Sequence, residues 1–303
     1  MSAVLIHNPA AGGGRSVRLL PGVLERLRSV GVRLEVHRTT SLDDARQAAR
    51  KAATTVDAVL AMGGDGTVGA CAAGLAEVPA ATAALGVIPA GGGNDAARNL
   101  GLPFGDPLTT ATLLPSLGAR RADLVRVGER YVLNAAGAGF DAEVSRRANR
   151  GLSRTPGRLR YVGAVLAELA VGRPAGFRLR LDGRVIDTSA WLVAVANSQS
   201  YGGGMRIAPA ALLDDALLDV VVIGGELSKP GFLAAFPKVF TGRHLEHPAV
   251  RVHRAARVEL EADRPLGVHA DGEPAGDLPA TFQVAPAAIA VLAADGAPAF
   301  NSP

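Results

Sequence analysis

The sequence predicts an α/β chain with two domains, and two observations carry this prediction. Over residues 1–123, short apolar runs alternate with helix-compatible stretches, which is the order typical of a doubly wound parallel sheet. From about residue 124, strand patterns dominate and few helices intervene, so we expect a mostly antiparallel β sandwich over residues 124–296. A chain of 303 residues is long enough to bury a core in each domain.

Four strands with intervening helices are expected in the first domain. The strands are expected at Ala3–Ile6, Val32–His37, Asp57–Met62 and Leu85–Ile88. Gly31 is a natural end for the helix before the second strand, because glycine adopts a left-handed C-cap without strain. Thr40 or Ser41 can cap the next helix, which carries alanines between residues 45 and 52.

The second domain is expected to consist of hairpins and single strands. Residues 125–132 predict one hairpin, and residues 177–186 predict another with Asp182-Gly183 at its turn. Further strands are expected at Trp191–Ala196, Leu217–Ile223, Val250–Leu260 and Ala288–Leu292. The helices expected there are chiefly Pro156–Val171 and Pro230–Phe240.

The loop Gly63-Gly64-Asp65-Gly66-Thr67, directly after the third strand, is the most informative motif. Glycines let the backbone approach a phosphate, and amides at the head of a helix face an anion with a favourable dipole. Asp65 adds a carboxylate suited to Mg²⁺, and Thr67 adds a hydroxyl. The loop favours a nucleotide-phosphate site, although its spacing is neither Walker A nor GxGxxG. A glycine-rich turn on its own is more often only a turn.

Two further glycine loops occupy equivalent places in the sequence. Residues 8–14 (Asn-Pro-Ala-Ala-Gly-Gly-Gly) follow the first strand, and residues 89–95 (Pro-Ala-Gly-Gly-Gly-Asn-Asp) follow the fourth. Because the carboxyl ends of parallel strands meet at one edge of an open sheet, the three loops are expected to converge on one crevice.

These loops begin a series of motifs that runs along nearly the whole chain. The series comprises Asn8-Pro9…Gly12, Gly63–Thr67, Pro89-x-Gly91 with Asn94-Asp95-x-Ala97-Arg98, Asn134…Gly139-Phe140-Asp141-Ala142, Gly202-Gly203-Gly204…Ala208-Pro209, Asp214-Asp215…Leu218-Asp219 and Asp271-Gly272-Glu273. In this order the motifs resemble the diacylglycerol kinase catalytic-domain family, lipid kinases that share a distant fold with NAD kinases and phosphofructokinases. The resemblance implies the same two-domain plan, with the active site in the cleft between the domains.

The resemblance also implies ATP as co-substrate and Mg²⁺ as cofactor. It places nucleotide contacts at Asn8, Pro9, Ala10, Ala11, Gly12, Thr39, Gly63, Gly64, Asp65, Gly66, Thr67, Val68, Gly69, Gly92 and Asn94. A carboxylate network around a catalytic Mg²⁺ is implied at Asp65, Asp95 and Asp123, a donor set that suits a hard cation. A second, structural Mg²⁺ is implied at one loop, with the Asp215 carboxylate and the backbone carbonyls of Leu212 and Leu217 as ligands.

The family places its catalytic base at the Glu of the last motif, which is Glu273 here. An alcohol is a poor nucleophile until a positioned carboxylate can take its proton. We expect Asp271 to orient the site or to help hold metal, so the catalytic set is Glu273, Asp271 and Asp65. Residues 268–270 are expected to form a short strand before the motif, and Pro274 is expected to end regular structure after it.

Structural roles remain open for several of these acids. Asp271 and Glu273 could flank a solvated turn, and Asp123 could cap a helix or make a hydrogen bond. Asp214-Asp215 could form a polar turn before the strand that follows.

The sequence departs from the family pattern in two places. Gly92 stands where most relatives have Thr, and Gly69-Ala70 stand where Asn-Glu is usual. A hydroxyl near the nucleotide and a carboxylate behind the phosphate loop are therefore missing. These departures indicate altered nucleotide affinity or a relative that has lost kinase activity. The retained Asp65, Asn94, Asp95 and Glu273 favour an active kinase.

The composition is that of an ordinary water-soluble protein, with 48% hydrophobic and 20% charged residues. Cys71 is the only cysteine, so no intramolecular disulfide forms and a reducing compartment is expected. There is no basic-then-apolar leader, and no apolar run approaches the roughly 20 residues of a spanning helix. We expect a cytoplasmic protein, or one peripheral on the inner face of a membrane.

The net charge of +4 is unevenly distributed, with six arginines and no acid between Arg146 and Arg160. This segment is either a solvated helix face or a surface that docks on anionic lipid. Aromatic residues make up only 4% of the chain, too few for a base-stacking platform, so nucleic acid is not expected as a partner. The expected partner is a lipid substrate, and contact with an anionic membrane and a homodimer stay open.

Three functions are therefore considered. The leading one is an ATP-dependent lipid kinase of lipid metabolism that phosphorylates a hydroxyl of diacylglycerol, a sphingoid or a related lipid. A soluble-metabolite kinase of the NAD-kinase kind shares the Gly-Gly-Asp-Gly core, but the Asn-Pro…Gly start and the late Asp-Gly-Glu belong to the lipid group. A catalytically impaired homologue that only binds lipid or nucleotide is the third.

Overall fold

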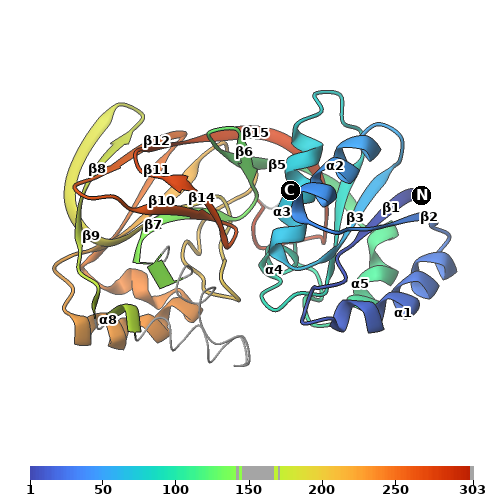
Figure 1. The fold of residues 1–303 in the computed structure, drawn as a ribbon, viewed down its shortest axis with the longest axis horizontal. Coiled ribbons are helices and arrows are strands. Elements are labelled where there is room, and N and C mark those ends of the chain that lie inside the picture. The colour runs from blue at the N-terminus through green and yellow to red at the C-terminus, as the bar shows by residue number, and fades with distance from the viewer. Residues whose placement is uncertain (141–142, 145–166, 170, 301–303) are drawn as a thin grey trace.

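The computed structural model of the protein has two lobes that lie side by side (Figure 1). It describes residues 1–140, 143–144, 167–169 and 171–300. The arginines between Arg146 and Arg160 lie outside the described residues, as does most of the helix expected at Pro156–Val171.

The first lobe is the expected α/β domain. Its elements are β1 (Ser2–His7), α1 (Arg15–Ser29), β2 (Arg33–Arg38), α2 (Leu42–Ala52), β3 (Ala58–Gly63), α3 (Asp65–Ala76), β4 (Ala84–Pro89), α4 (Asp95–Asn99), α5 (Pro107–Leu113) and the 3₁₀ turn η1 (Leu114–Ser116). The strands pair in the order β2-β1-β3-β4, all parallel. Ser41 caps α2 by accepting a hydrogen bond from the amide of Asp44, as one of the two expected capping residues.

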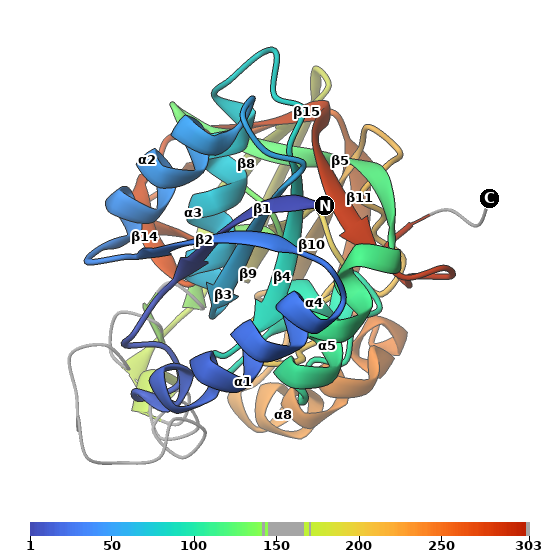
Figure 2. The same cartoon turned by 90° about the vertical axis from the view of Figure 1, so that its right-hand side faces the viewer.

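Helices cover both faces of this parallel sheet, which confirms the doubly wound prediction. In side view α1 and α5 lie on one face, and α2 and α3 lie on the other (Figure 2). Neighbouring residues of a strand point to opposite faces, and so Leu5 of β1 packs in the core under α1 while Ile6 packs in the core under α2 and α3.

Two long strands, β5 (Gly118–Val127) and β15 (Ala280–Ala293), connect the lobes. β15 pairs in parallel with β4 at one end and antiparallel with β12 (Arg257–Ala262) at the other. The strand expected at Ala288–Leu292 is only the last part of β15. The pairing register of β15 with β5 shifts between Ala285 and Ile289, where Ala287 has a left-handed φ of 48°. This irregularity interrupts the strand pattern in the sequence, so the first half of β15 was not predicted.

The second lobe is mostly antiparallel, as expected. Its other strands are β6 (Arg130–Val132), β7 (Ala135–Gly139), β8 (Ala175–Leu181), β9 (Arg184–Ala196), β10 (Leu218–Gly224), β11 (Val250–Ala255), β13 (Gly267–Ala270) and β14 (Glu273–Asp277). Both expected hairpins are present, β5–β6 and β8–β9. The strand expected at Val250–Leu260 is interrupted at Ala256, so it forms β11 and β12 with different neighbours.

The expectation that Pro274 ends regular structure is wrong. β14 begins at Glu273 and includes Pro274, and it pairs with β13. The pairing register shifts between Val268 and His269, opposite this stretch. β14 lies at the end of the strand order and has no partner beyond it among the described strands, and an edge position tolerates a proline.

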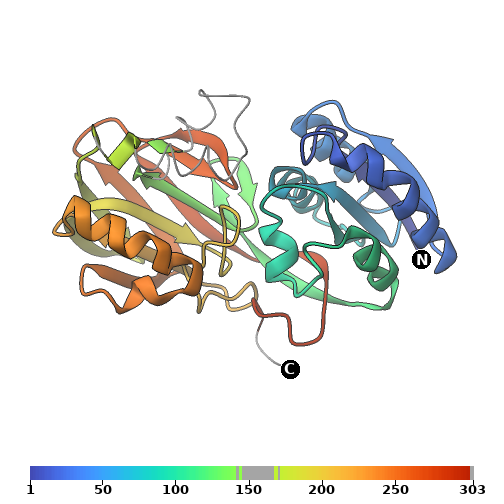
Figure 3. The same ribbon diagram turned by 90° about the horizontal axis from the view of Figure 1, so that it is seen from below.

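A short helical layer covers the outer face of β9 and β10. It consists of α8 (Lys229–Ala235), the 3₁₀ segment η2 (Phe236–Thr241) that follows it directly, and, after Gly242, the 3₁₀ segment η3 (Arg243–Glu246). This layer is drawn in orange on the β lobe in Figure 3. Phe232 of α8 packs against Trp191 and Phe140, with ring centroids 5.6 Å and 4.7 Å away. The described part of the chain contains no helix long and apolar enough to cross a bilayer.

Candidate functional site

The three glycine loops meet at the carboxyl ends of β1, β3 and β4, which are neighbours in the sheet. The side-chain amide of Asn8 donates to the hydroxyl of Thr67 over 2.9 Å and so ties the first loop to the second. Thr39 lies beside them at the end of β2, where its amide donates to the carbonyl of His7. The predicted convergence of the loops is therefore confirmed.

Glycine is required where these loops touch. A Cβ on Gly12, which has a φ of 60°, would lie 2.5 Å from the carbonyl oxygen of Ala90. A Cβ on Gly91 would lie 2.4 Å from the Cα of Gly64. Real Cβ atoms do not approach backbone this closely, so the loops pack backbone against backbone.

Gly92 is a contrast within the same loop. A Cβ built there meets nothing within 4 Å, and its φ lies outside the left-handed region. There is therefore room at this position for the threonine side chain that most relatives carry. Asn94 holds the loop from within, because its side chain accepts from the amide of Gly91 and donates to the carbonyl of Phe104.

Asp65 of the second glycine loop and Asp95 of the third form a pair of acids. Asp65 begins α3 and accepts a 2.9 Å hydrogen bond from the amide of Ala96 in α4. Burial, together with the negative charge of Asp95, raises the pKa of Asp65 to about 6. A cation would relieve this repulsion, so the pair has the donor chemistry for Mg²⁺.

Asp95 connects this pair to the second lobe. Its side chain is 2% exposed, and its two oxygens accept hydrogen bonds of 2.6 and 2.7 Å from the amides of Gly203 and Gly204. Gly202, Gly203 and Gly204 all have left-handed φ angles, which glycine adopts without strain. The sequence contains this glycine run, but the contact with Asp95 was not anticipated.

Glu273 and Asp271 reach the site from the hairpin between β13 and β14. Asp271 and Gly272 form its two-residue turn with φ angles of 46° and 86°, as an Asp-Gly hairpin turn requires. Glu273 is exposed, and its Oε1 lies 3.9 Å from the position of a Cβ on Gly66, in the first turn of α3. The structure therefore places Glu273 next to the glycine loop at residues 63–67.

Asp271 is instead bound to backbone. Its carboxylate accepts hydrogen bonds from the amides of Leu133, Asn134 and Ala135, at 3.0, 3.1 and 3.3 Å. Burial raises its pKa, and these bonds oppose that shift. This geometry supports the expected orienting role of Asp271, since its carboxylate holds the turn before Glu273 against the chain segment that leads into β7.

Asp123 lies with a different group of acids. Its carboxylate accepts from the amides of Ala216 and Ala287, both at 2.7 Å, and burial raises its pKa, with contributions from the charges of Asp215 and Asp214. The carboxylate of Asp123 thus joins the loop proposed to hold a structural metal to β15, whereas Asp65 interacts with Asp95.

Two arginines from elsewhere in the chain already contact the acids of the loop at residues 212–217. The Asp215 carboxylate contacts the guanidinium of Arg254, and Asp214 pairs with Arg120 at 3.2 Å. A cation there would have to displace Arg254 from Asp215. Among the described residues, no three acids, histidines or cysteines come close enough together to hold a metal by themselves, so a Mg²⁺ at Asp65 would need further ligands such as phosphate oxygens or water.

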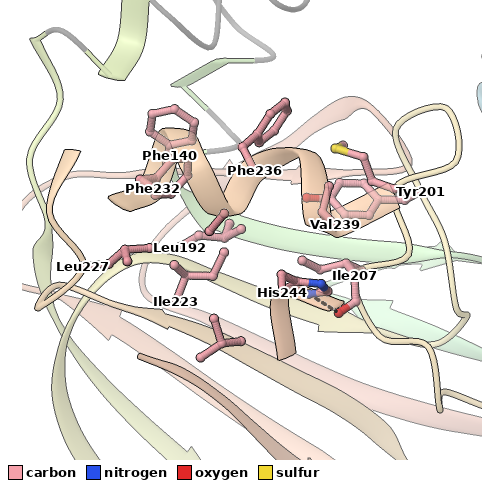
Figure 4. Close-up of a pocket in the computed structure, with 13 residues that line it drawn as sticks. Phe140, Leu192, Tyr201, Ile207, Ile223, Leu227, Phe232, Phe236, Val239 and His244 are labelled. Carbon is pink, nitrogen blue, oxygen red and sulfur yellow. Dashed lines mark hydrogen bonds between the residues drawn. The ribbon is translucent and has the colours of Figure 1, made fainter. Parts of the chain in front are cut away.

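An apolar pocket lies beside the Gly202–Gly204 loop, because Tyr201 and Met205 at the two ends of that loop line it (Figure 4). It is lined by Phe140, Leu192, Tyr201, Met205, Ile207, Ile223, Leu227, Phe232, Ala235, Phe236, Val239, His244 and Val250. Tyr201 and Met205 flank the glycines and exchange two backbone hydrogen bonds of 3.1 Å. One five-residue loop thus contributes both to the pocket and, through its amides, to the acid pair. No sequence signal marked the pocket, because its residues come from many separate segments.

The remaining predicted nucleotide contacts lie in or beside the first two glycine loops. Pro9, Ala10 and Ala11 are in the first loop, and Gly63 ends β3. Val68 packs in the core, so only its backbone faces the loop region. Gly69 packs on Asp271, whose Oδ2 would lie 3.1 Å from a Cβ at this position.

Comparisons with known proteins agree with the two-lobe architecture. Residues 2–127 match the model of the diacylglycerol kinase catalytic domain, and residues 134–293 match that of the YegS C-terminal NAD kinase beta sandwich-like domain. The diacylglycerol kinase of Mycobacterium tuberculosis is 39% identical over 297 residues, which cover 95% of this chain and 93% of that protein. The diacylglycerol kinase of Bacillus subtilis is 32% identical over 285 residues, covering 92% of each chain.

Solved structures share the fold. A crystal structure of a diacylglycerol kinase from Bacillus anthracis superposes with a TM-score of 0.76 at 23% identity, covering 98% of each chain. Another crystal structure from the same organism gives a TM-score of 0.82 at 25% identity, covering 98% of this chain and 96% of that one. The fold class is therefore confirmed.

The buried acid pair predicts an unusual effect of Asp65→Asn on stability. Because the folded-state pKa of Asp65 is raised, its contribution to stability is present below about pH 4 and is lost as the pH rises through about 6. We expect the Asn variant, which does not ionise, to be more stable than the wild type at pH 7.5 by on the order of 1–2 kcal/mol. The difference should shrink toward pH 5 in urea unfolding.

Asp106→Asn is the matched control. Hydrogen bonds from Thr109 and Leu108 lower the pKa of Asp106, so its neutral variant should gain no stability at pH 7.5. If Asp65→Asn is no more stable than the wild type at that pH, the repulsion between Asp65 and Asp95 is not a cost to the fold.

Proposed function

The chain belongs to the diacylglycerol kinase family, and we propose that it transfers the γ-phosphate of ATP to a hydroxyl group of diacylglycerol or a related lipid. The observation that carries this proposal is the loop Tyr201–Met205. Its side chains line an apolar pocket suited to an acyl chain, while its amides bind Asp95 beside the phosphate loops. A lipid whose chains occupied the pocket would therefore present its polar end toward the phosphate site.

The phosphate-binding part of the site fits a nucleoside triphosphate. The three loops supply backbone amides, and α3 begins at Asp65 with its positive dipole end toward them. We place Mg²⁺ at Asp65, with phosphate oxygens completing its ligands. The cation would supply charge neutralisation on the transferring phosphate.

Glu273 is the group placed to accept the proton of the lipid hydroxyl. It is exposed at the start of β14 and comes close to Gly66, so an acceptor alcohol could lie between the carboxylate and the phosphate loop. Asp271 acts through position, since it fixes the turn that carries Glu273. A general base of this kind typically contributes 10²–10⁴-fold to the rate.

Arg254 argues against a second, structural Mg²⁺ at the Asp215 loop, because its guanidinium already occupies the Asp215 carboxylate. Asp123 would then support that loop rather than the catalytic ion. Association with the inner face of an anionic membrane, a cytoplasmic location and a homodimer stay predictions. The segment between Arg146 and Arg160, proposed for membrane contact, lies outside the described residues.

The decisive experiment is transfer of radiolabelled phosphate from ATP to a panel of acceptors. We expect phosphorylation of diacylglycerol or a related lipid in the presence of Mg²⁺, and no phosphorylation of NAD. Transfer to NAD alone would support the soluble-metabolite alternative. Binding of ATP and lipid without transfer would support the catalytically impaired homologue.

Glu273→Gln tests the proton acceptor. The amide keeps the shape of the side chain but does not take a proton, so turnover should fall by roughly two to four orders of magnitude while ATP binding and stability stay near the wild type. Asp271→Asn is the comparison: it should lower the melting temperature, because an amide replaces a buried acceptor of three backbone hydrogen bonds. An active Glu273→Gln beside a folded but dead Asp271→Asn would show that the two roles are exchanged.

Gly92→Thr tests the nucleotide site. The Cβ meets open space, so we expect unchanged stability and ATP binding tighter by a few-fold, up to about tenfold, from one added hydrogen bond. Gly91→Ala is the matched control, since its Cβ would lie 2.4 Å from the Cα of Gly64 and should disrupt the loop. Unchanged ATP affinity in Gly92→Thr would place this position outside the nucleotide site.

A further inference from the structure

The helical segment α8–η2 exposes a stripe of apolar side chains. The stripe consists of Pro230, Leu233, Ala234, Pro237 and Phe240, all of which are exposed. Pro230, Leu233, Pro237 and Phe240 follow one another at intervals of three or four residues, which puts them on one side of the segment, and Ala234 lies next to Leu233. Leu233 is 46% exposed and Phe240 is 43% exposed, values that are high for large apolar residues. Single exposed apolar residues are ordinary, but a contiguous stripe marks a contact surface.

The opposite side of the same segment lines the apolar pocket. Phe232, Ala235, Phe236 and Val239 all face it. The rings of Phe236 and Phe240 are in edge contact, with centroids 6.2 Å apart. An apolar path therefore runs from the exposed ring of Phe240 through Phe236 to the pocket. This continuity favours a lipid bilayer over a soluble protein as the partner of the stripe, because lipid could move along it into the pocket.

The charges around the stripe are positive. Two of the three lysines in the chain, Lys229 and Lys238, lie next to it, and no acid occurs between residues 227 and 245. The nearest acids in sequence are already paired: Glu226 contacts Arg251 at 2.6 Å, and Glu246 contacts Arg243 at 3.1 Å. An apolar strip flanked by cations is complementary to a bilayer with anionic head groups.

We propose that the α8–η2 stripe docks the protein on an anionic phospholipid bilayer, with Leu233 and Phe240 entering the interface and the two lysines contacting head groups. This inference rests on the proposed lipid kinase function. It adds the surface by which the apolar pocket would meet its substrate, since a lipid leaving the bilayer beside Phe240 would enter the pocket along Phe236.

Vesicle sedimentation without ATP tests the proposal independently of catalysis. The full-length protein is mixed with vesicles of phosphatidylglycerol and phosphatidylcholine, or of phosphatidylcholine alone. We expect binding to the anionic vesicles, with the partition coefficient lowered at least tenfold in the Leu233→Gln/Phe240→Gln variant. Lys238→Gln should weaken binding about fivefold at low salt and have little effect at high salt.

Val185→Gln is the matched control. The side chain of Val185 is 45% exposed, nearly the same exposed fraction as that of Leu233. Val185 lies in the β8–β9 hairpin, at the end of the β lobe opposite α8 in Figure 1. Its variant should bind vesicles as the wild type does. Trp191, the only tryptophan, packs on Phe232 of α8, so its fluorescence should change on binding.

Three results would overturn the proposal. One is no binding of the wild type to anionic vesicles, and another is equal binding of Leu233→Gln/Phe240→Gln and Val185→Gln. The third is a wild-type dimer that becomes a monomer in the stripe variant, which would make the stripe an interface between copies. A short-chain, water-soluble diacylglycerol separates the two proposals: its phosphorylation by both wild type and stripe variant supports the kinase function, whatever the vesicles show.

Discussion

The geometry of the candidate site depends on the two hydrogen bonds that Asp95 accepts from the Gly203 and Gly204 amides. A buried carboxylate is costly unless donors satisfy it, and here the donors come from the other lobe. The bonds hold a loop of left-handed glycines in place, and that loop carries Tyr201 and Met205 to the apolar pocket. The charge fixed in this way also raises the pKa of Asp65, after burial itself. One contact therefore influences both the position of the loop that borders the apolar pocket and the electrostatics of the acid pair at the glycine loops.

The parts of the fold that follow from local patterns could be predicted from the sequence. The three glycine loops each follow an apolar strand, and parallel pairing of adjacent strands was enough to predict that they meet. The hairpin turn at Asp182-Gly183 is likewise set by its own two residues. β15 was predicted only in part, because Ala287 interrupts its pattern, and β14 was missed, because the cost of a proline depends on whether its strand lies at an edge.

Which acids share a site could not be read from the chain, because this depends on contacts between distant segments. The family resemblance groups Asp123 with Asp65 and Asp95 in one carboxylate network, yet the carboxylate of Asp123 binds the amides of Ala216 and Ala287. Asp271 and Glu273 are two residues apart, but their environments are opposite. The first is bound to three amides and the second is exposed toward Gly66. The turn between them is local, whereas the partner of each side chain lies more than a hundred residues away.

The two departures from the family pattern also differ physically. Gly69 lies against Asp271, and a side chain there would have to push away a carboxylate that holds three backbone amides. The absence of a side chain at Gly69 thus allows Asp271 to approach α3 closely. The charge of Asp271 in turn contributes to the raised pKa of Asp65. Gly92 has no such neighbour, since the space around it is open. The absence of a side chain at Gly69 is therefore part of the packing between the lobes, whereas no neighbouring atom requires a glycine at position 92.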